Sequence, residues 1–137
     1  MMSPPLVLVV EDDVELRLFY KQALAEEGFR TDEAHNGFQA LEKALREVPD
    51  LIVTDIAVPG LDGIELCRRL RTNAVTREIP VLAVTGYGDR HYEDRAREAG
   101  AVQVLIKPFS GDRLVVEARR LVAESARART PSSRELP

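Results

Sequence analysis

The sequence predicts an α/β domain in which helices cover both faces of a five-stranded parallel sheet. Short apolar runs alternate with segments of helical periodicity along the 137 residues, as in consecutive βα units. Several runs are continuously apolar, a pattern typical of strands that are buried on both faces of a parallel sheet. Right-handed crossovers between parallel strands then leave few possible topologies.

The first βα unit begins with the valine-rich run Leu6–Val10, which predicts a strand. Asp12 or Asp13 follows at the N-cap position of a helix, where a carboxylate accepts hydrogen bonds from free backbone N–H groups. Apolar residues then recur at helical spacing until Gly28 ends this helix.

The second unit combines a weaker strand, Phe29–Ala34, with a helix that the turn Asn36–Gly37 opens and Pro49 stops. The third unit has its strand at Leu51–Thr54, and Asp62–Gly63 forms the turn that starts its helix.

Two further units complete the predicted sheet. Val81–Val84 predicts the fourth strand, and a polar helix follows over Asp89–Ala99. Val102–Ile106 predicts the fifth strand, and the last helix covers Gly111–Ala123.

Composition limits the function classes. We expect one domain over residues 5–124 and a disordered tail over Ser125–Pro137, which is rich in Ser, Arg and Pro and has no periodicity. The net charge is −4 with scattered Lys and Arg, which argues against a nucleic-acid surface. A single cysteine, Cys67, excludes an intrachain disulfide. No signal peptide or membrane-spanning run is visible, so a cytoplasmic protein without membrane contact is expected.

Polar residues follow four of the predicted strands, at the edge where open α/β sheets bind their ligands. They are Glu11, Asp12 and Asp13 after the first strand, Asp55 after the third, Thr85 and Gly86 after the fourth, and Lys107 and Pro108 after the fifth. Alone, each has a structural interpretation as a helix cap, a turn or loop residue, or a surface lysine. Their coincidence on one edge favours a functional site.

The residue types predict the chemistry of this site. Carboxylates from Glu11, Asp12 and Asp55 would repel one another, and a hard divalent cation such as Mg²⁺ relieves that repulsion. Lys107 adds a positive charge for a phosphoryl oxygen, and Thr85 adds a hydroxyl donor. A nucleophile, a metal and a charge clamp are the parts that transfer a phosphoryl group to a carboxylate.

Four motifs make the chain recognisable. They are Val9-Val10-Glu11-Asp12-Asp13, Asp55-Ile-Ala-Val-Pro-Gly-Leu-Asp62-Gly63, Thr85-Gly86 and Lys107-Pro108-Phe109. With them, the chain resembles the receiver domains of bacterial two-component response regulators from about Pro5 to Ala123. The implied fold is CheY-like, a doubly wound, flavodoxin-like sheet in the strand order 2-1-3-4-5.

The resemblance implies a metal site. Asp55 would be both the phosphoacceptor and a ligand of Mg²⁺, and Asp12 would bind the metal directly. Glu11 would act through metal-bound water, and the backbone carbonyl of Ala57 would be a further ligand.

The resemblance also implies how the phosphoryl group is held. Lys107 would pair with Asp55 and then with its phosphoryl group, while Thr85 would swing toward a phosphoryl oxygen. The Lys107–Pro108 peptide bond is expected to be cis, which proline makes accessible.

The implied protein is a phosphoacceptor switch and not a metabolic enzyme. A sensor histidine kinase or a histidine phosphotransfer protein would donate the group, and water would hydrolyse the acyl phosphate slowly. Tyr87 and Ala57, which flank the site, would tune its lifetime. The switch would control a protein partner that the sequence does not identify, and the polar fourth helix is suited to move. The initial Met and the short tail favour a stand-alone regulator over a fragment.

Three positions depart from the family pattern. Val58 replaces the usual Met before the proline of the second motif, and Gly86 replaces a frequent Ala; being smaller, Gly86 should still admit the phosphoryl group. Val104 stands where many receivers carry a Tyr or Phe that rotates inward on activation, so that rotation is not expected in this chain.

Other function classes fit less well. A haloacid-dehalogenase-like phosphatase needs an acid two residues after its nucleophile, where this chain has Ala57. A nucleotide-binding module would need more than the fragment Gly86-Tyr-Gly88. A pseudo-receiver that is never phosphorylated is disfavoured by the complete acidic set together with Thr85 and Lys107.

Overall fold

The computed structural model describes residues 3–86 and 90–129. The strands are β1 (Leu6–Val10), β2 (Arg30–Ala34), β3 (Leu51–Asp55), β4 (Val81–Thr85) and β5 (Gln103–Ile106). The helices are α1 (Val14–Glu26), α2 (Gly37–Glu47), α3 (Gly63–Arg71), α4 (Arg90–Glu98) and α5 (Gly111–Arg129).

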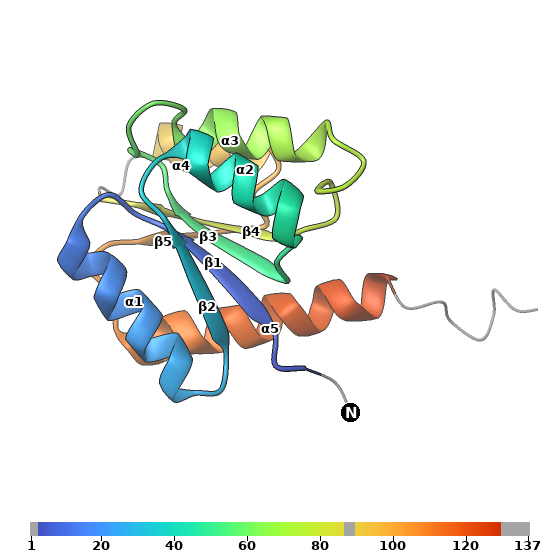
Figure 1. Ribbon diagram of the computed structural model, residues 1–137. Helices are drawn as coiled ribbons and strands as arrows, with labels where there is room; N and C mark the ends of the chain where they lie inside the picture. The colour runs from blue at the N-terminus through green and yellow to red at the C-terminus, as the bar shows by residue number, and fades with distance from the viewer. Residues whose placement is uncertain (1–2, 87–89, 130–137) are drawn as a thin grey trace, which may run out of the picture.

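The five strands form one parallel sheet in the order β2-β1-β3-β4-β5, which confirms the predicted fold class and strand order. Figure 1 shows the three layers, with α1 and α5 below the sheet and α2, α3 and α4 above it. Because all strands run the same way, the residues that follow them meet at one edge of the sheet.

Each face of the sheet builds its own core. On one face, Leu8 and Ile52 pack with apolar residues of α2, α3 and α4. On the other, Val9, Val53 and Leu82 pack with residues of α1 and α5. Because side chains alternate along each strand and both faces are covered, the central strands consist of apolar runs up to the polar residues at their ends.

Helix α5 is longer than predicted. It continues through residues 125–129, which the sequence assigns to a disordered tail. These residues lack apolar periodicity, but alanine and arginine have high helix propensity. One turn earlier, Arg120 pairs with Glu124 at 3.1 Å, an (i, i+4) contact that supports a helix here. The rest of the predicted tail, residues 130–137, lies outside the described residues.

Helix α4 is consistent with the predicted polar helix, although Asp89 lies outside the described residues. Ala96 and Ala99 are buried, whereas Tyr92 is exposed over 42% of its surface and does not anchor the helix in the core. Within residues 3–86 and 90–129, no helix has the length and apolar character needed to cross a membrane.

Candidate functional site

Asp55 is the last residue of β3 and is only 7% exposed. Its Oδ1 atom accepts a hydrogen bond from the Ala57 backbone N–H at 2.9 Å. Gly63 lets α3 begin directly against this strand end, since a Cβ atom there would lie 2.5 Å from the Asp55 carbonyl oxygen. The carboxylate is therefore held in place by its own turn and by the start of α3.

Lys107 reaches this carboxylate from the end of β5. Its Nζ atom lies 2.5 Å from Asp55 Oδ2 and 3.4 Å from Glu11 Oε1, so one ammonium group bridges two acids from two other strands. Burial alone would lower the pKa of Lys107, but the hydrogen bond and charge of Asp55 and the charge of Glu11 raise it above its ordinary value. The side chain therefore stays cationic at neutral pH.

The segment that carries Lys107 is fixed on both sides of the lysine. The Lys107 N–H donates to the carbonyl oxygen of Thr85 at 2.8 Å. The Lys107–Pro108 peptide bond is cis, as expected. Beyond it, the ring of Phe109 stacks on Tyr20 of α1, with ring centroids 5.5 Å apart and planes 13° apart. These contacts orient the lysine toward the acids.

Glu11 is the most buried acid at this edge, with 2% exposure. Its pKa rises from 4.5 to about 7, mainly because of burial and also because of nearby Asp55, while the Asp13 N–H bond and Lys107 lower the pKa. Its Oε2 atom accepts from the Asp13 N–H at 3.1 Å. Two carboxylates beside one ammonium leave negative charge that is only partly compensated.

Asp13, not Asp12, caps the first helix. Its Oδ1 atom accepts from the Leu16 N–H at 3.0 Å. This leaves the neighbouring Asp12 carboxylate exposed at the end of β1, directly after the buried Glu11. The structure thus assigns the helix cap to Asp13 and leaves the Asp12 carboxylate accessible.

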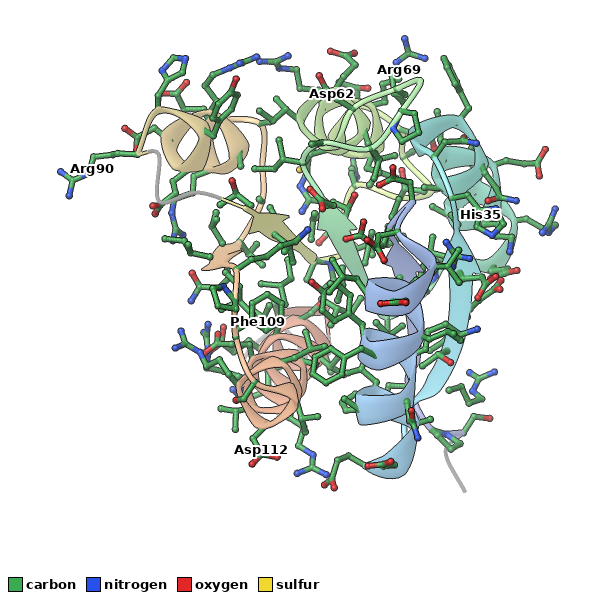
Figure 2. All side chains as sticks on the ribbon, turned by 90° about the vertical axis from the view of Figure 1, so that its left-hand side faces the viewer. His35, Asp62, Arg69, Arg90, Phe109 and Asp112 are labelled. Carbon is green, nitrogen blue, oxygen red and sulfur yellow. The ribbon has the colours of Figure 1, made fainter. Side chains whose placement is uncertain are left out.

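A hollow of about 440 Å³ lies beside Asp55. It is lined by Asp55, Ile56, Ala57, Asp62, Thr85, Gly86, Tyr92 and Lys107. Figure 2 looks onto this edge of the sheet, with Asp62 and Arg90 on the α3 and α4 side and Phe109 on the α5 side. The structure therefore brings Asp55, Thr85 and Lys107 to one cavity, as predicted.

The acids at this edge suit a cation that keeps part of its own water shell. Within the described residues, no three His, Cys, Asp or Glu side chains converge on one point, so the expected side-chain trio does not form a closed metal cage. Mg²⁺ does not need one, because it usually keeps several waters and takes one or two carboxylates from the protein. The pairing of two acids with one lysine leaves a surplus of negative charge that such a cation would relieve.

Two features of this edge escape the sequence patterns. Arg17 of α1 is buried, and its Nη1 atom donates to the Glu11 carbonyl oxygen at 2.8 Å. Tyr92 of α4 lines the hollow beside Asp55. The sequence around Arg17 or Tyr92 does not predict these positions, because the sequence pattern of a helix does not show which distant residue a charged or aromatic side chain will contact. Tyr87, which is expected to flank the site, lies outside the described residues.

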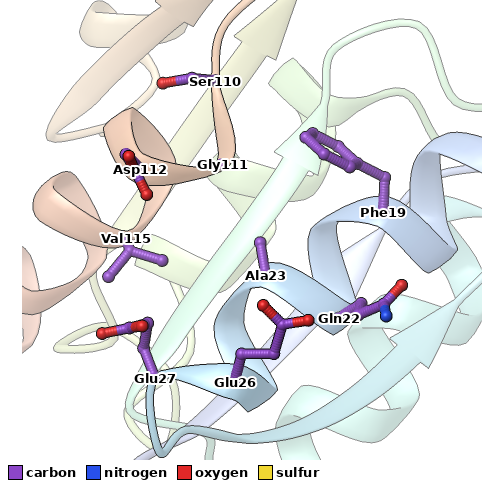
Figure 3. A pocket seen from close by; sticks show the side chains of 9 residues that line it. All are labelled: Phe19, Gln22, Ala23, Glu26, Glu27, Ser110, Gly111, Asp112 and Val115. Atoms are coloured by element: carbon purple, nitrogen blue, oxygen red, sulfur yellow. The ribbon is translucent and has the colours of Figure 1, made fainter.

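A second hollow, of about 390 Å³, lies between α1 and the start of α5. Figure 3 shows its lining, with Phe19, Glu26 and Glu27 on the α1 side and Asp112 and Val115 on the α5 side. No lysine or arginine lines it within the described part of the chain, in contrast to the hollow beside Asp55. It therefore lacks a charge partner for an anionic group.

Comparison with known families gives one match that covers most of the chain. Residues 7–119 match the response regulator receiver domain. Sporulation initiation phosphotransferase F of Bacillus subtilis is 34% identical over 108 residues, which cover 79% of this chain and 86% of that protein. The transcriptional regulatory protein ResD of the same organism is 33% identical over 135 residues, which cover 95% of this chain but 55% of ResD. The chain thus spans about half the length of this longer relative.

Solved structures agree with the sequence comparison. A receiver domain protein from Methanospirillum hungatei superposes with a TM-score of 0.86 at 25% identity, covering 92% of this chain and 99% of that one. A putative response regulator from Chloroflexus aurantiacus gives a TM-score of 0.85 at 32% identity, covering 88% of this chain and 98% of that one.

Proposed function

Since the chain belongs to the response regulator receiver domain family, we propose that Asp55 accepts a phosphoryl group from the phosphohistidine of a sensor kinase or phosphotransfer protein. The observation that carries this proposal is the position of Lys107, whose ammonium group bridges Asp55 and Glu11 at the end of the sheet. A buried carboxylate beside a fixed cation has the environment that a phosphoacceptor needs.

The transfer would proceed in line. A carboxylate oxygen of Asp55 forms a bond to phosphorus while the bond from phosphorus to the donor imidazole nitrogen breaks, and the electron pair leaves with the imidazole. Lys107 is already in contact with Asp55, and its ammonium group would then pair with an oxygen of the transferred phosphoryl group. The Thr85 hydroxyl, in the same hollow, would donate to another.

Mg²⁺ would supply charge neutralisation for the transferred group when it is bound. We propose Asp12, Asp55 and the backbone carbonyl of Ala57 as its protein ligands, with Glu11 acting through water. The exposure of Asp12 and Ala57 next to the buried acids supports this set, since both are accessible to a hydrated cation.

The proposed protein is a switch with slow self-dephosphorylation. The position two residues after Asp55 is Ala57, which has no group to act as the general acid of a phosphatase. Its output would be a protein contact that changes with phosphorylation, without direct binding of nucleic acid or membrane, in the cytoplasm. The receiver unit would comprise residues 5–124.

An intact-mass experiment tests the proposal. Wild-type protein, Asp55→Asn and Asp62→Asn are incubated with acetyl phosphate and Mg²⁺. We expect one added phosphoryl mass on wild type and on Asp62→Asn, because asparagine keeps the helix-capping role of Asp62. Asp55→Asn should gain none. Phosphoryl mass persisting in Asp55→Asn would refute the assignment of the acceptor.

The same assay tests the metal ligands. Chelation of Mg²⁺ should abolish labelling of wild type, and Asp12→Ala should need more Mg²⁺ for the same rate. Asp13→Asn is the matched control, because asparagine preserves the N-cap that Asp13 provides. Equal Mg²⁺ requirements for wild type and Asp12→Ala would exclude Asp12 as a ligand.

A further inference from the structure

The hollow beside Asp55 has an aromatic wall to which the proposed transfer assigns no role. Tyr92, in the first turn of α4, lines it together with Asp55, Thr85 and Lys107. It is the only aromatic residue among the described residues that line this hollow. The ring therefore borders the same hollow as the carboxylate that would carry the phosphoryl group.

The neighbouring lining residues leave that space open. Ala57 contributes only a methyl group and is exposed. Gly86 contributes no side chain, and a Cβ atom added there would meet nothing within 4 Å. Small residues at these two positions leave room for water to approach, and among the described lining residues Tyr92 contributes the only ring that borders this room.

The Tyr92 ring has contacts that hold it in this position. The guanidinium carbon of Arg95 lies 5.8 Å from its centroid, within the range of a cation–π contact. Ala96, one turn further along α4, is buried and fixes this face of the helix against the sheet. With 42% exposure, the ring is divided between the hollow and solvent.

We infer that the Tyr92 ring restricts the access of water to the acyl phosphate of Asp55 and so sets its lifetime. The inference rests on the proposed function. In the hydrolysis, a water oxygen bonds to phosphorus and the bond from phosphorus to the Asp55 oxygen breaks. The electron pair returns to the Asp55 carboxylate, and the proton of the water leaves with the phosphate or to solvent. The ring takes no part in these bonds and acts by excluding volume.

Single-turnover hydrolysis tests this role. Wild type, Tyr92→Ala and Tyr92→Phe are phosphorylated with acetyl phosphate and Mg²⁺, desalted rapidly, and followed by intact mass and by phosphate release. Tyr92→Ala should lose the group about fivefold faster than wild type, a change of ~1 kcal/mol in the barrier. Tyr92→Phe, which keeps the ring, should match wild type. Val116→Ala, which shortens an exposed apolar side chain on α5, is the surface control.

The outcomes separate the two proposals. The melting temperature of unphosphorylated Tyr92→Ala should match that of wild type. A merely structural role for the ring would instead lower the melting temperature of this variant. Equal lifetimes for Tyr92→Ala and wild type overturn the inference, as does a Tyr92→Phe variant that hydrolyses as fast as Tyr92→Ala. A wild-type protein that takes no phosphoryl group overturns the proposed function and this inference with it.

Discussion

At the scale of single residues, burial sets the charge states that the site needs. Glu11 lies at the end of an apolar strand and is 2% exposed, so its carboxylate loses hydration that Lys107 and the Asp13 N–H only partly replace. Lys107 gains more from Asp55 and Glu11 than it loses by burial. The site therefore holds its negative charge at a cost in folding stability, as functional sites often do.

The Glu11→Gln variant measures that cost. Because the pKa of Glu11 rises from 4.5 to about 7 on folding, the folded state binds more protons than the unfolded state between these values. The free energy of unfolding therefore falls as the pH rises through this window. In EDTA at pH 8, Glu11→Gln should be more stable than wild type by ~1 kcal/mol or more, and the difference should shrink toward pH 4.

Urea unfolding at pH 4, 6 and 8 checks this prediction. Glu26→Gln, which changes an exposed glutamate on α1, serves as the control and should follow wild type at each pH. If the difference in stability between Glu11→Gln and wild type does not depend on pH, the raised pKa of Glu11 in the folded protein is contradicted.

At the scale of elements, the sequence predicts those strands and helices that an apolar pattern marks. Each of the strands β1, β3 and β4 begins with a continuous apolar run, and the sequence predicts its bounds to within a residue. β2 has only one buried residue, Ala34, and was a weaker prediction. The last turns of α5 were missed because helix propensity without periodicity resembles a polar tail. The convergence of Asp55, Thr85 and Lys107 was predictable because parallel strands share an edge.

Contacts between elements that use polar side chains could not be predicted in this way. Arg71, at the end of α3, donates from Nη2 to the Gly100 carbonyl oxygen at 2.8 Å and from Nη1 to the Ile79 carbonyl oxygen at 2.6 Å. Gly100 has φ +114°, and a Cβ atom there would lie 2.7 Å from Arg71 Cγ. The arginine thus joins α3 to the end of α4 and to the start of β4.

Arg71→Ala should destabilise the protein by ~2 kcal/mol, because it leaves carbonyl groups without their charged donor. Arg69→Ala is the matched control on the same helix. Arg69 is exposed and pairs only with Glu65 among the described residues, at 3.3 Å, so its loss should cost less than ~0.5 kcal/mol. Urea unfolding of both variants measures the loss in the free energy of unfolding. Equal losses for Arg71→Ala and Arg69→Ala would contradict a special role for Arg71.

At the scale of the whole molecule, the two faces of the sheet have different roles at the active edge. The α1 and α5 face supplies the Tyr20–Phe109 stack that positions the lysine segment. The other face supplies Tyr92 and the starts of α3 and α4 around the hollow. Val104 is buried on this second face beside Ala96 and Ala99, so a valine fills the interior beneath α4. Asp55 ends β3, the central strand between these two layers of helices, so its proposed phosphorylation would be sensed from both.

The measurement that most directly tests the central claim is identification of the modified residue. Protein phosphorylated with acetyl phosphate and Mg²⁺ is reduced with borohydride, which converts an aspartyl phosphate to homoserine, and the peptides are sequenced by mass spectrometry. We predict homoserine at position 55 and at no other aspartate. Homoserine at Asp12, Asp13 or Asp62 in place of Asp55, or label recovered on a different residue type, would contradict the account.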